Sequence, residues 1–125
     1  MHNFARVAFA LVAVSWLQAP VLAATPPAKP LTPKEIQATF GTGKPFTSST
    51  PSGTSYTITL NGDGTASRMP KKGKVAITGK WRVSKDGYCS TWGKGTENCY
   101  LIRKDSDRYK VVDPKGSVVA YWKTN

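Results

Sequence analysis

The sequence predicts a mainly β protein, an antiparallel meander of about 7–8 strands forming a small barrel or sandwich with one short N-terminal helix. Three observations indicate this fold. From residue 55 onward, short segments alternate apolar and polar residues with the period of a half-buried strand. Most of these segments end in a tight-turn signal rich in Gly, Asn, Asp or Lys. Two cysteines, Cys89 and Cys99, flank one such turn. A Greek-key oligonucleotide- or oligosaccharide-binding barrel is the alternative, since it also allows a short helix.

The N-terminus has the pattern of an export signal. Residues 1–6 carry one positive side chain, and residues 7–17 form an apolar run. Small side chains at Val21 and Ala23 fit signal-peptidase cleavage after Ala23. The run is shorter than the roughly 20 residues that a membrane-spanning helix needs. We therefore expect residues 1–23 to be a cleaved signal peptide, leaving a periplasmic or secreted protein with no membrane span.

The mature chain is expected to begin with a flexible arm and continue as one domain. Residues 24–31 are rich in proline, which is typical of an extended arm. Residues 32–125 are of a length suited to a single β-barrel-like domain.

A short helix is predicted at the start of this domain. Thr32 and Glu35 have the spacing of a capping box, and Pro33 suits the first helical position. Ile36 and Phe40 then form one apolar edge. Because two turns are too few to be stable alone, this helix should pack on the sheet.

Tight turns divide the rest of the domain into strands. A strand is expected near Phe46, and the segment 55–60 alternates clearly. Val75 and Ile77 are expected to share one face of a strand that begins near residue 74. The predicted turns are residues 61–64, 71–73, 85–87, 93–95, 105–107 and 113–116.

The cysteines predict the register of the central hairpin. Positions 89 and 99 are symmetric about Lys94, so a three-residue loop 93–95 would place Cys89 opposite Cys99 and Trp92 opposite Thr96. A disulfide between them fits an oxidising compartment. The aromatic residues of the other face form either part of the core or a binding platform, and the core is favoured. They are Tyr88, Trp92 and Tyr100.

A strong positive charge indicates anionic partners. The chain has 18 Lys and Arg against seven Asp and Glu, a net charge of +11. The first hypothesis is binding of anionic envelope polymers or lipids through a basic patch. Single-stranded nucleic acid is an alternative, and export argues against it. A small apolar ligand inside the barrel is another, although side chains are expected to fill so small an interior. The proposed patch consists of Lys71, Lys72, Lys74, Lys80 and Arg82.

The supply of histidine, free cysteine and acidic residues argues against a catalytic function. The one histidine, His2, leaves with the signal peptide, so histidine acid–base and metal chemistry are lost. A disulfide removes thiolate chemistry. Most acidic residues sit in turn signals, where Asp bonds its own backbone. We therefore expect no catalytic residues, no metal and no cofactor; the oligomeric state is left open.

Six short motifs stand out along the mature chain: residues 31–36, 63–66, 79–83, 87–92, 97–100 and 109–113. Together they resemble a family of small exported bacterial β-rich proteins of uncharacterised function with one disulfide hairpin. The resemblance covers most of the mature chain and implies a fold and a location but no activity. Separately, residues 79–81, Gly-Lys-Trp, are similar to the Gly-x-Trp of lipocalins, which implies a lipocalin-like barrel, although here the motif lies mid-chain rather than on the first strand.

Overall fold

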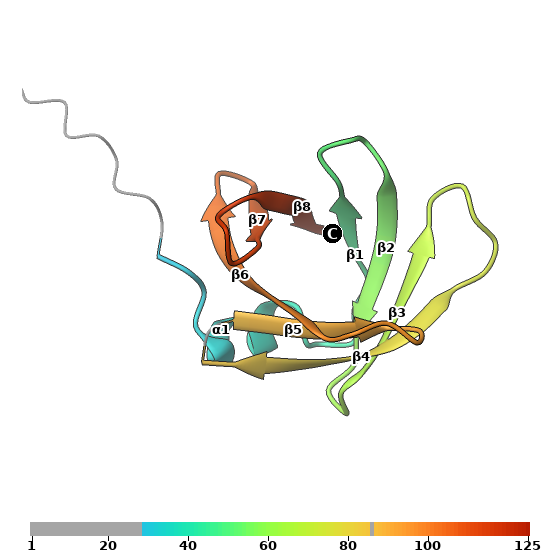
Figure 1. Cartoon of the computed structure of the whole chain (residues 1–125), viewed down its shortest axis with the longest axis horizontal. Coiled ribbons are helices and arrows are strands. Elements are labelled where there is room, and N and C mark those ends of the chain that lie inside the picture. The colour runs from blue at the N-terminus through green and yellow to red at the C-terminus, as the bar shows by residue number, and fades with distance from the viewer. Residues whose placement is uncertain (1–28, 86) are drawn as a thin grey trace, which may run out of the picture.

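A computed structural model describes residues 29–85 and 87–125, and in it one short helix precedes eight strands (Figure 1). The predicted mainly β fold with a short helix is confirmed. The predicted signal peptide, residues 1–23, lies outside the described residues. The elements are α1 Pro33–Thr39, β1 Phe46–Ser49, β2 Ser55–Leu60, β3 Thr65–Pro70, β4 Ile77–Ser84, β5 Gly87–Trp92, β6 Asn98–Asp105, β7 Arg108–Val112 and β8 Val118–Thr124.

The strands form a closed barrel in which each strand pairs antiparallel with the next in sequence. The barrel closes between β1 and β8, where Phe46 pairs with Thr124 and Ser49 with Tyr121. Consecutive order is that of an up-and-down barrel, so the sandwich and Greek-key alternatives are wrong. Among the described residues, closure gives every strand of the barrel a neighbour on both sides.

Helix α1 covers one end of the barrel, where it contacts β4 and β5 (Figure 1). The predicted capping box is present: the Thr32 hydroxyl accepts from the Glu35 N–H, and the Glu35 carboxylate accepts from the Thr32 N–H, each at 3.2 Å. Ile36 and Phe40 are buried, at 0% and 1% exposure. The helix therefore acts as a plug, as its two-turn length requires.

Aromatic rings fill the helix-covered end. The Phe40 ring lies 4.9 Å from that of Phe46, 4.8 Å from that of Trp122 and 5.0 Å from that of Tyr109. Leu60 is fully buried in the same core cluster. These edge-to-face contacts pack the barrel interior densely near α1.

The β3–β4 connection is longer than predicted. We expected a strand from about residue 74 with Val75 facing inward, but β4 begins at Ile77 and Val75 is 77% exposed. Pro70 ends β3 and has no N–H to continue the ladder, and its carbonyl instead accepts the Gly73 N–H. Residues 71–76 therefore form an exposed loop.

The predicted pairing of Cys89 with Cys99 is confirmed, whereas the tip of the β5–β6 hairpin differs from the prediction. Cys89 pairs with Cys99, and the two form a disulfide. The predicted pairing of Trp92 with Thr96 is absent, since a turn closes earlier through the Gly95 N–H to the Trp92 carbonyl at 3.0 Å. The β5–β6 loop thus spans residues 93–97.

Part of the predicted arm packs on the barrel. Pro30 forms an isolated bridge with Arg103, and the Leu31 N–H donates to the Ile102 carbonyl at 2.7 Å. Residues 24–28 lie outside the described residues. Within the part of the chain that the structure describes, no helix has both the length and the apolar character to cross a membrane.

Candidate functional site

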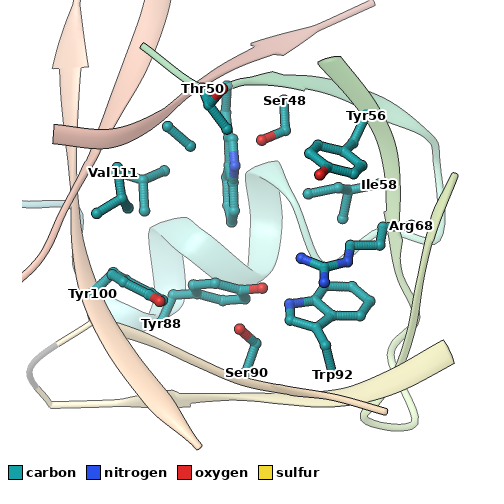
Figure 2. Close-up of a pocket in the computed structure, with 13 residues that line it drawn as sticks. Ser48, Thr50, Tyr56, Ile58, Arg68, Tyr88, Ser90, Trp92, Tyr100 and Val111 are labelled. Atoms are coloured by element: carbon teal, nitrogen blue, oxygen red, sulfur yellow. The ribbon is translucent and has the colours of Figure 1, made fainter. Parts of the chain in front are cut away.

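The interior of the barrel is not completely filled. A cavity of about 170 Å³ lies in the half of the barrel away from α1. In Figure 2 the ribbon of α1 is seen behind the residues that line this cavity. The expectation that side chains fill the whole interior is therefore wrong. The cavity is lined by Ser48, Thr50, Tyr56, Ile58, Arg68, Tyr88, Ser90, Trp92, Tyr100, Val111, Val119, Ala120 and Trp122.

The period-two geometry of the strands directs these side chains inward. In β3, Ala66 is buried in the core, so Arg68, two residues later, faces the same side. In β5, Tyr88 and Trp92 face inward, while Cys89 between them faces outward. Gly79 pairs with Trp92, and its missing side chain leaves room for the indole ring.

Arg68 is the one charged residue among the described residues that line the cavity. Its Cζ lies 4.7 Å from the centroid of the Trp92 ring and 5.4 Å from that of Tyr56 (Figure 2). Both contacts are cation–π interactions. The Arg68 Nε is buried and has no hydrogen-bond partner within residues 29–85 and 87–125.

Polar groups converge on the cavity from neighbouring strands. Tyr88 is 3% exposed, and Figure 2 shows its hydroxyl pointing toward Arg68 and Trp92. Burial raises the pKa of Tyr88 to about 12, against the opposing effects of a Ser90 hydrogen bond and the Arg68 charge. The hydroxyl therefore stays protonated and can donate. Ser48 and Ser90, each 4% exposed, add two more hydroxyls.

The predicted placement of Tyr88, Trp92 and Tyr100 on one face is confirmed, and all three line the cavity. Tyr88 belongs to the core and packs on Trp122, with centroids 4.9 Å apart. Trp92 and Tyr100 are half-buried and line the cavity. On this face, Tyr88 thus belongs to the core, and Trp92 and Tyr100 form part of the cavity wall.

The five residues of the predicted basic patch do not lie together. Lys71, Lys72 and Lys74 are exposed in the β3–β4 loop. Lys80 pairs with Thr65, the first residue of β3, and so lies toward the opposite end of the barrel. Lys80 and Arg82 instead line a shallow outer hollow that also contains Asp63 and Glu97.

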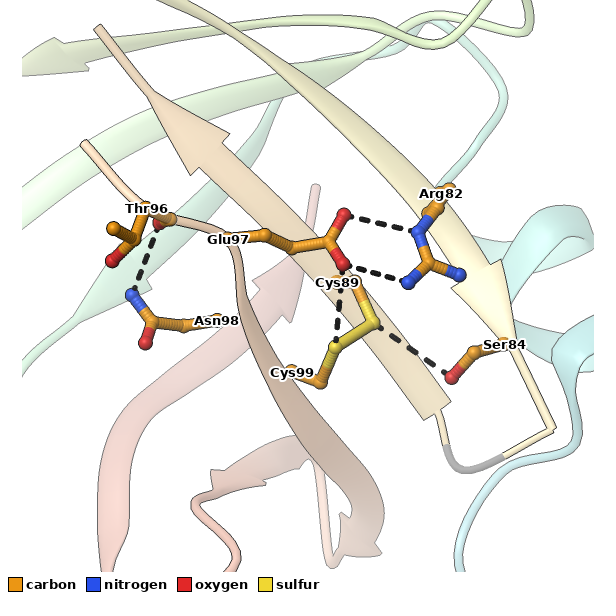
Figure 3. Close-up of a disulfide and its surroundings, with 7 residues drawn as sticks. All are labelled: Arg82, Ser84, Cys89, Thr96, Glu97, Asn98 and Cys99. Carbon is orange, nitrogen blue, oxygen red and sulfur yellow. Dashed lines mark hydrogen bonds and ion pairs between the residues drawn. A yellow bond between two sulfur atoms is a disulfide. The ribbon is translucent and has the colours of Figure 1, made fainter. Parts of the chain in front are cut away.

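Arg82 is already engaged by an acidic partner. Its Nε and Nη2 donate to the two Glu97 oxygens at 3.0 and 2.6 Å (Figure 3). This pair raises the pKa of Arg82 and lowers that of Glu97, chiefly through these hydrogen bonds. Arg82 is therefore a poor candidate for binding an external anion.

The loop lysines gather at the cavity end of the barrel. In an up-and-down barrel alternate connections lie at the same end, and here those connections are residues 50–54, 71–76, 93–97 and 113–117. Besides the three lysines of the β3–β4 loop, this end carries exposed Lys94 and Lys115. In the described part of the chain, none of these lysines forms an ion pair.

The disulfide lies on the outer face and offers no metal site. Ligand atoms of Cys89, Glu97 and Cys99 lie within 4.8 Å of one another (Figure 3). The two sulfurs are bonded to each other, which removes the thiolates that a metal would need.

Arg68 is the site residue that sequence reasoning missed. The segment 65–69 has no clear apolar alternation, and arginine is among the residue types that are mostly exposed. The available signal was its spacing from Ala66, which puts both on one face. Comparison of the chain with protein-family models, curated proteins and solved structures gives no significant match.

Proposed function

We propose that this is an exported, non-enzymatic binding protein whose barrel takes a small ligand into the cavity at its open end. The observation that carries the proposal is the cavity itself, in which apolar walls surround a few convergent polar groups. Its volume of about 170 Å³ resembles that of a cavity that holds one benzene, about 150 Å³. The ligand is therefore about the size of a single ring.

Filling the cavity tests this function. Ala120 lines the cavity, so Ala120→Leu should occupy the ligand's space while preserving an apolar wall. Binding of benzyl alcohol is followed by NMR at the Trp92 indole N–H. We expect saturable shifts in the wild type and their loss in Ala120→Leu.

Ala38→Leu is the matched control, since it adds the same atoms to an exposed helix position. It should bind benzyl alcohol like the wild type. Absence of saturable binding to the wild type, or equal binding by Ala120→Leu, would contradict the proposal.

A second candidate function is attachment to anionic envelope polymers or lipids. It is supported by the exposed lysines of the loops at the open end, which form no ion pair within residues 29–85 and 87–125. Attraction of this exposed kind is screened by salt, because the Debye length is about 8 Å at physiological ionic strength.

Charge reversal at one end of the barrel tests this candidate. Retention on immobilised lipopolysaccharide should fall steeply with salt and be lost in the triple variant Lys71→Glu, Lys72→Glu, Lys74→Glu. A control triple, Lys34→Glu, Lys44→Glu, Lys85→Glu, makes the same charge change elsewhere and should retain binding. Equal loss of retention in both variants would mean that the attraction is nonspecific and would contradict this candidate. Elution of the bound wild-type protein by a single-stranded oligonucleotide at a lower concentration than by an acidic glycan would favour nucleic acid as the partner instead.

A further inference from the structure

Arg68 places a positive charge in the cavity without a counter-ion. Its guanidinium has five N–H donors and no acceptor, and the buried Nε–H is unpartnered among the described residues. The rings of Tyr56 and Trp92 stabilise the charge from their faces but accept no in-plane hydrogen bond. Arg68 is half-buried and only its Nε is enclosed, so an anion in the cavity would add a charge-assisted hydrogen bond to this guanidinium.

None of the described acidic residues forms an ion pair with Arg68. Glu97 is bound to Arg82 on the outer face, and Asp113 accepts the N–H groups of Lys115 and Ser117. The Tyr88 hydroxyl remains protonated to high pH and so approaches Arg68 as a neutral group. The Arg68 guanidinium is therefore available to an anion that comes from outside the described part of the chain.

We infer that the ligand is a small organic carboxylate, with its carboxylate on the Arg68 guanidinium and an apolar body of about one ring in the rest of the cavity. This inference rests on the proposed ligand-binding function. A planar carboxylate matches the guanidinium fork, and the Tyr88 hydroxyl offers a further donor. Ile58, Val111 and Trp122 provide apolar wall for the body.

The charge around the entrance agrees with an anionic ligand. The lysines at the open end raise the local concentration of anions, and this effect weakens with salt. The Arg68 contact lies inside the barrel and is screened less. Salt should therefore slow association more than it weakens the final ion pair.

A matched ligand pair tests the inference in the unmodified protein. Benzoate and benzamide have nearly the same shape and differ in charge. We expect benzoate to bind at least about tenfold more tightly than benzamide, by NMR titration at the Trp92 indole N–H. Arg68→Gln should remove this preference, and Arg68→Lys, which keeps the charge without the fork, should restore part of it.

Arg108→Gln is the control variant. It removes an equal charge from Arg108, which lies over Tyr121 outside the cavity, and should keep the preference for benzoate. Equal affinities of the wild type for benzoate and benzamide would overturn the carboxylate inference and leave cavity binding standing. Failure of benzoate, benzamide and benzyl alcohol to bind would overturn both.

Discussion

A single glycine sets the position of one cavity wall. A Cβ built on Gly79 would collide with the Thr91 carbonyl oxygen and lie 2.9 Å from Cε3 of Trp92. Trp92 in turn stacks on Arg68. The absence of one side chain in β4 thus lets the indole ring of Trp92 pack on the Arg68 guanidinium.

Gly79→Ala should therefore destabilise the protein by about 1–3 kcal/mol, the usual cost of overpacking. Gly62→Ala is the matched control, since a Cβ there meets nothing within 4 Å. Urea denaturation of both variants measures the difference. Equal stability of the two variants would show that β4 and β5 separate at no cost.

Tyr88 should give stability a distinct dependence on alkaline pH. Its folded pKa of about 12 exceeds the unfolded value of 10.0, so the folded state holds its proton longer. Stability is retained below pH 10 and falls as the pH rises toward 12. Between pH 10 and 11 the wild type should lose about 1 kcal/mol more than Tyr88→Phe, measured by urea denaturation. Parallel pH profiles would contradict this.

The β5–β6 hairpin combines a short ladder with a covalent link. Only Tyr88, Cys89 and Ser90 pair with β6, and the disulfide joins the middle pair, whose Cα atoms are 4.0 Å apart. Because the disulfide faces away from the cavity, it stabilises the wall without contacting a ligand.

Removal of the disulfide should cost stability but spare binding. The sequence separation of 10 gives about 2.5–3 kcal/mol in the chain-entropy treatment. The double variant Cys89→Ala, Cys99→Ala should lose about this much free energy of unfolding and, while folded, bind benzoate like the wild type. The wild-type protein with its disulfide reduced should show the same loss of stability and the same binding as this double variant. Loss of binding in a folded variant would give the disulfide a role in the site.

Among the elements, sequence alone predicts those marked by strong local signals. The capping box of α1 and the cysteine register follow from short-range spacing, and both are confirmed. The prediction for the β3–β4 connection is wrong because Val75 fits the period of a strand in sequence. Its side chain is nevertheless exposed, since pairing with β3 resumes only at Ile77. Arg68 was missed because only closure of the barrel encloses its face.

At the scale of the whole molecule, the barrel has a filled end and a hollow end. The helix plug and the ring cluster around Phe40 occupy one end. The other contains the cavity and is surrounded by loops that carry lysine. Composition predicts the excess charge but not which lysines lie at the open end, because that depends on which connections the topology brings together.

Export is a prediction about the whole chain. We expect the exported protein to begin at Ala24, because Val21 and Ala23 provide the small side chains that signal peptidase requires. Intact-mass measurement of protein recovered from the periplasm or medium checks this. A mass that includes Met1 would show that the segment is retained.

The seam between β1 and β8 has a consequence for the order of events during biosynthesis. Phe46 pairs with Thr124, so the first strand of the barrel needs the last as its neighbour. Contacts so distant in sequence form late and slowly. A chain that crosses a membrane from its N-terminus onward cannot complete this barrel before its final residues emerge. If the chain is exported as predicted, the barrel can close on the far side of the membrane only after translocation of the last strand has ended.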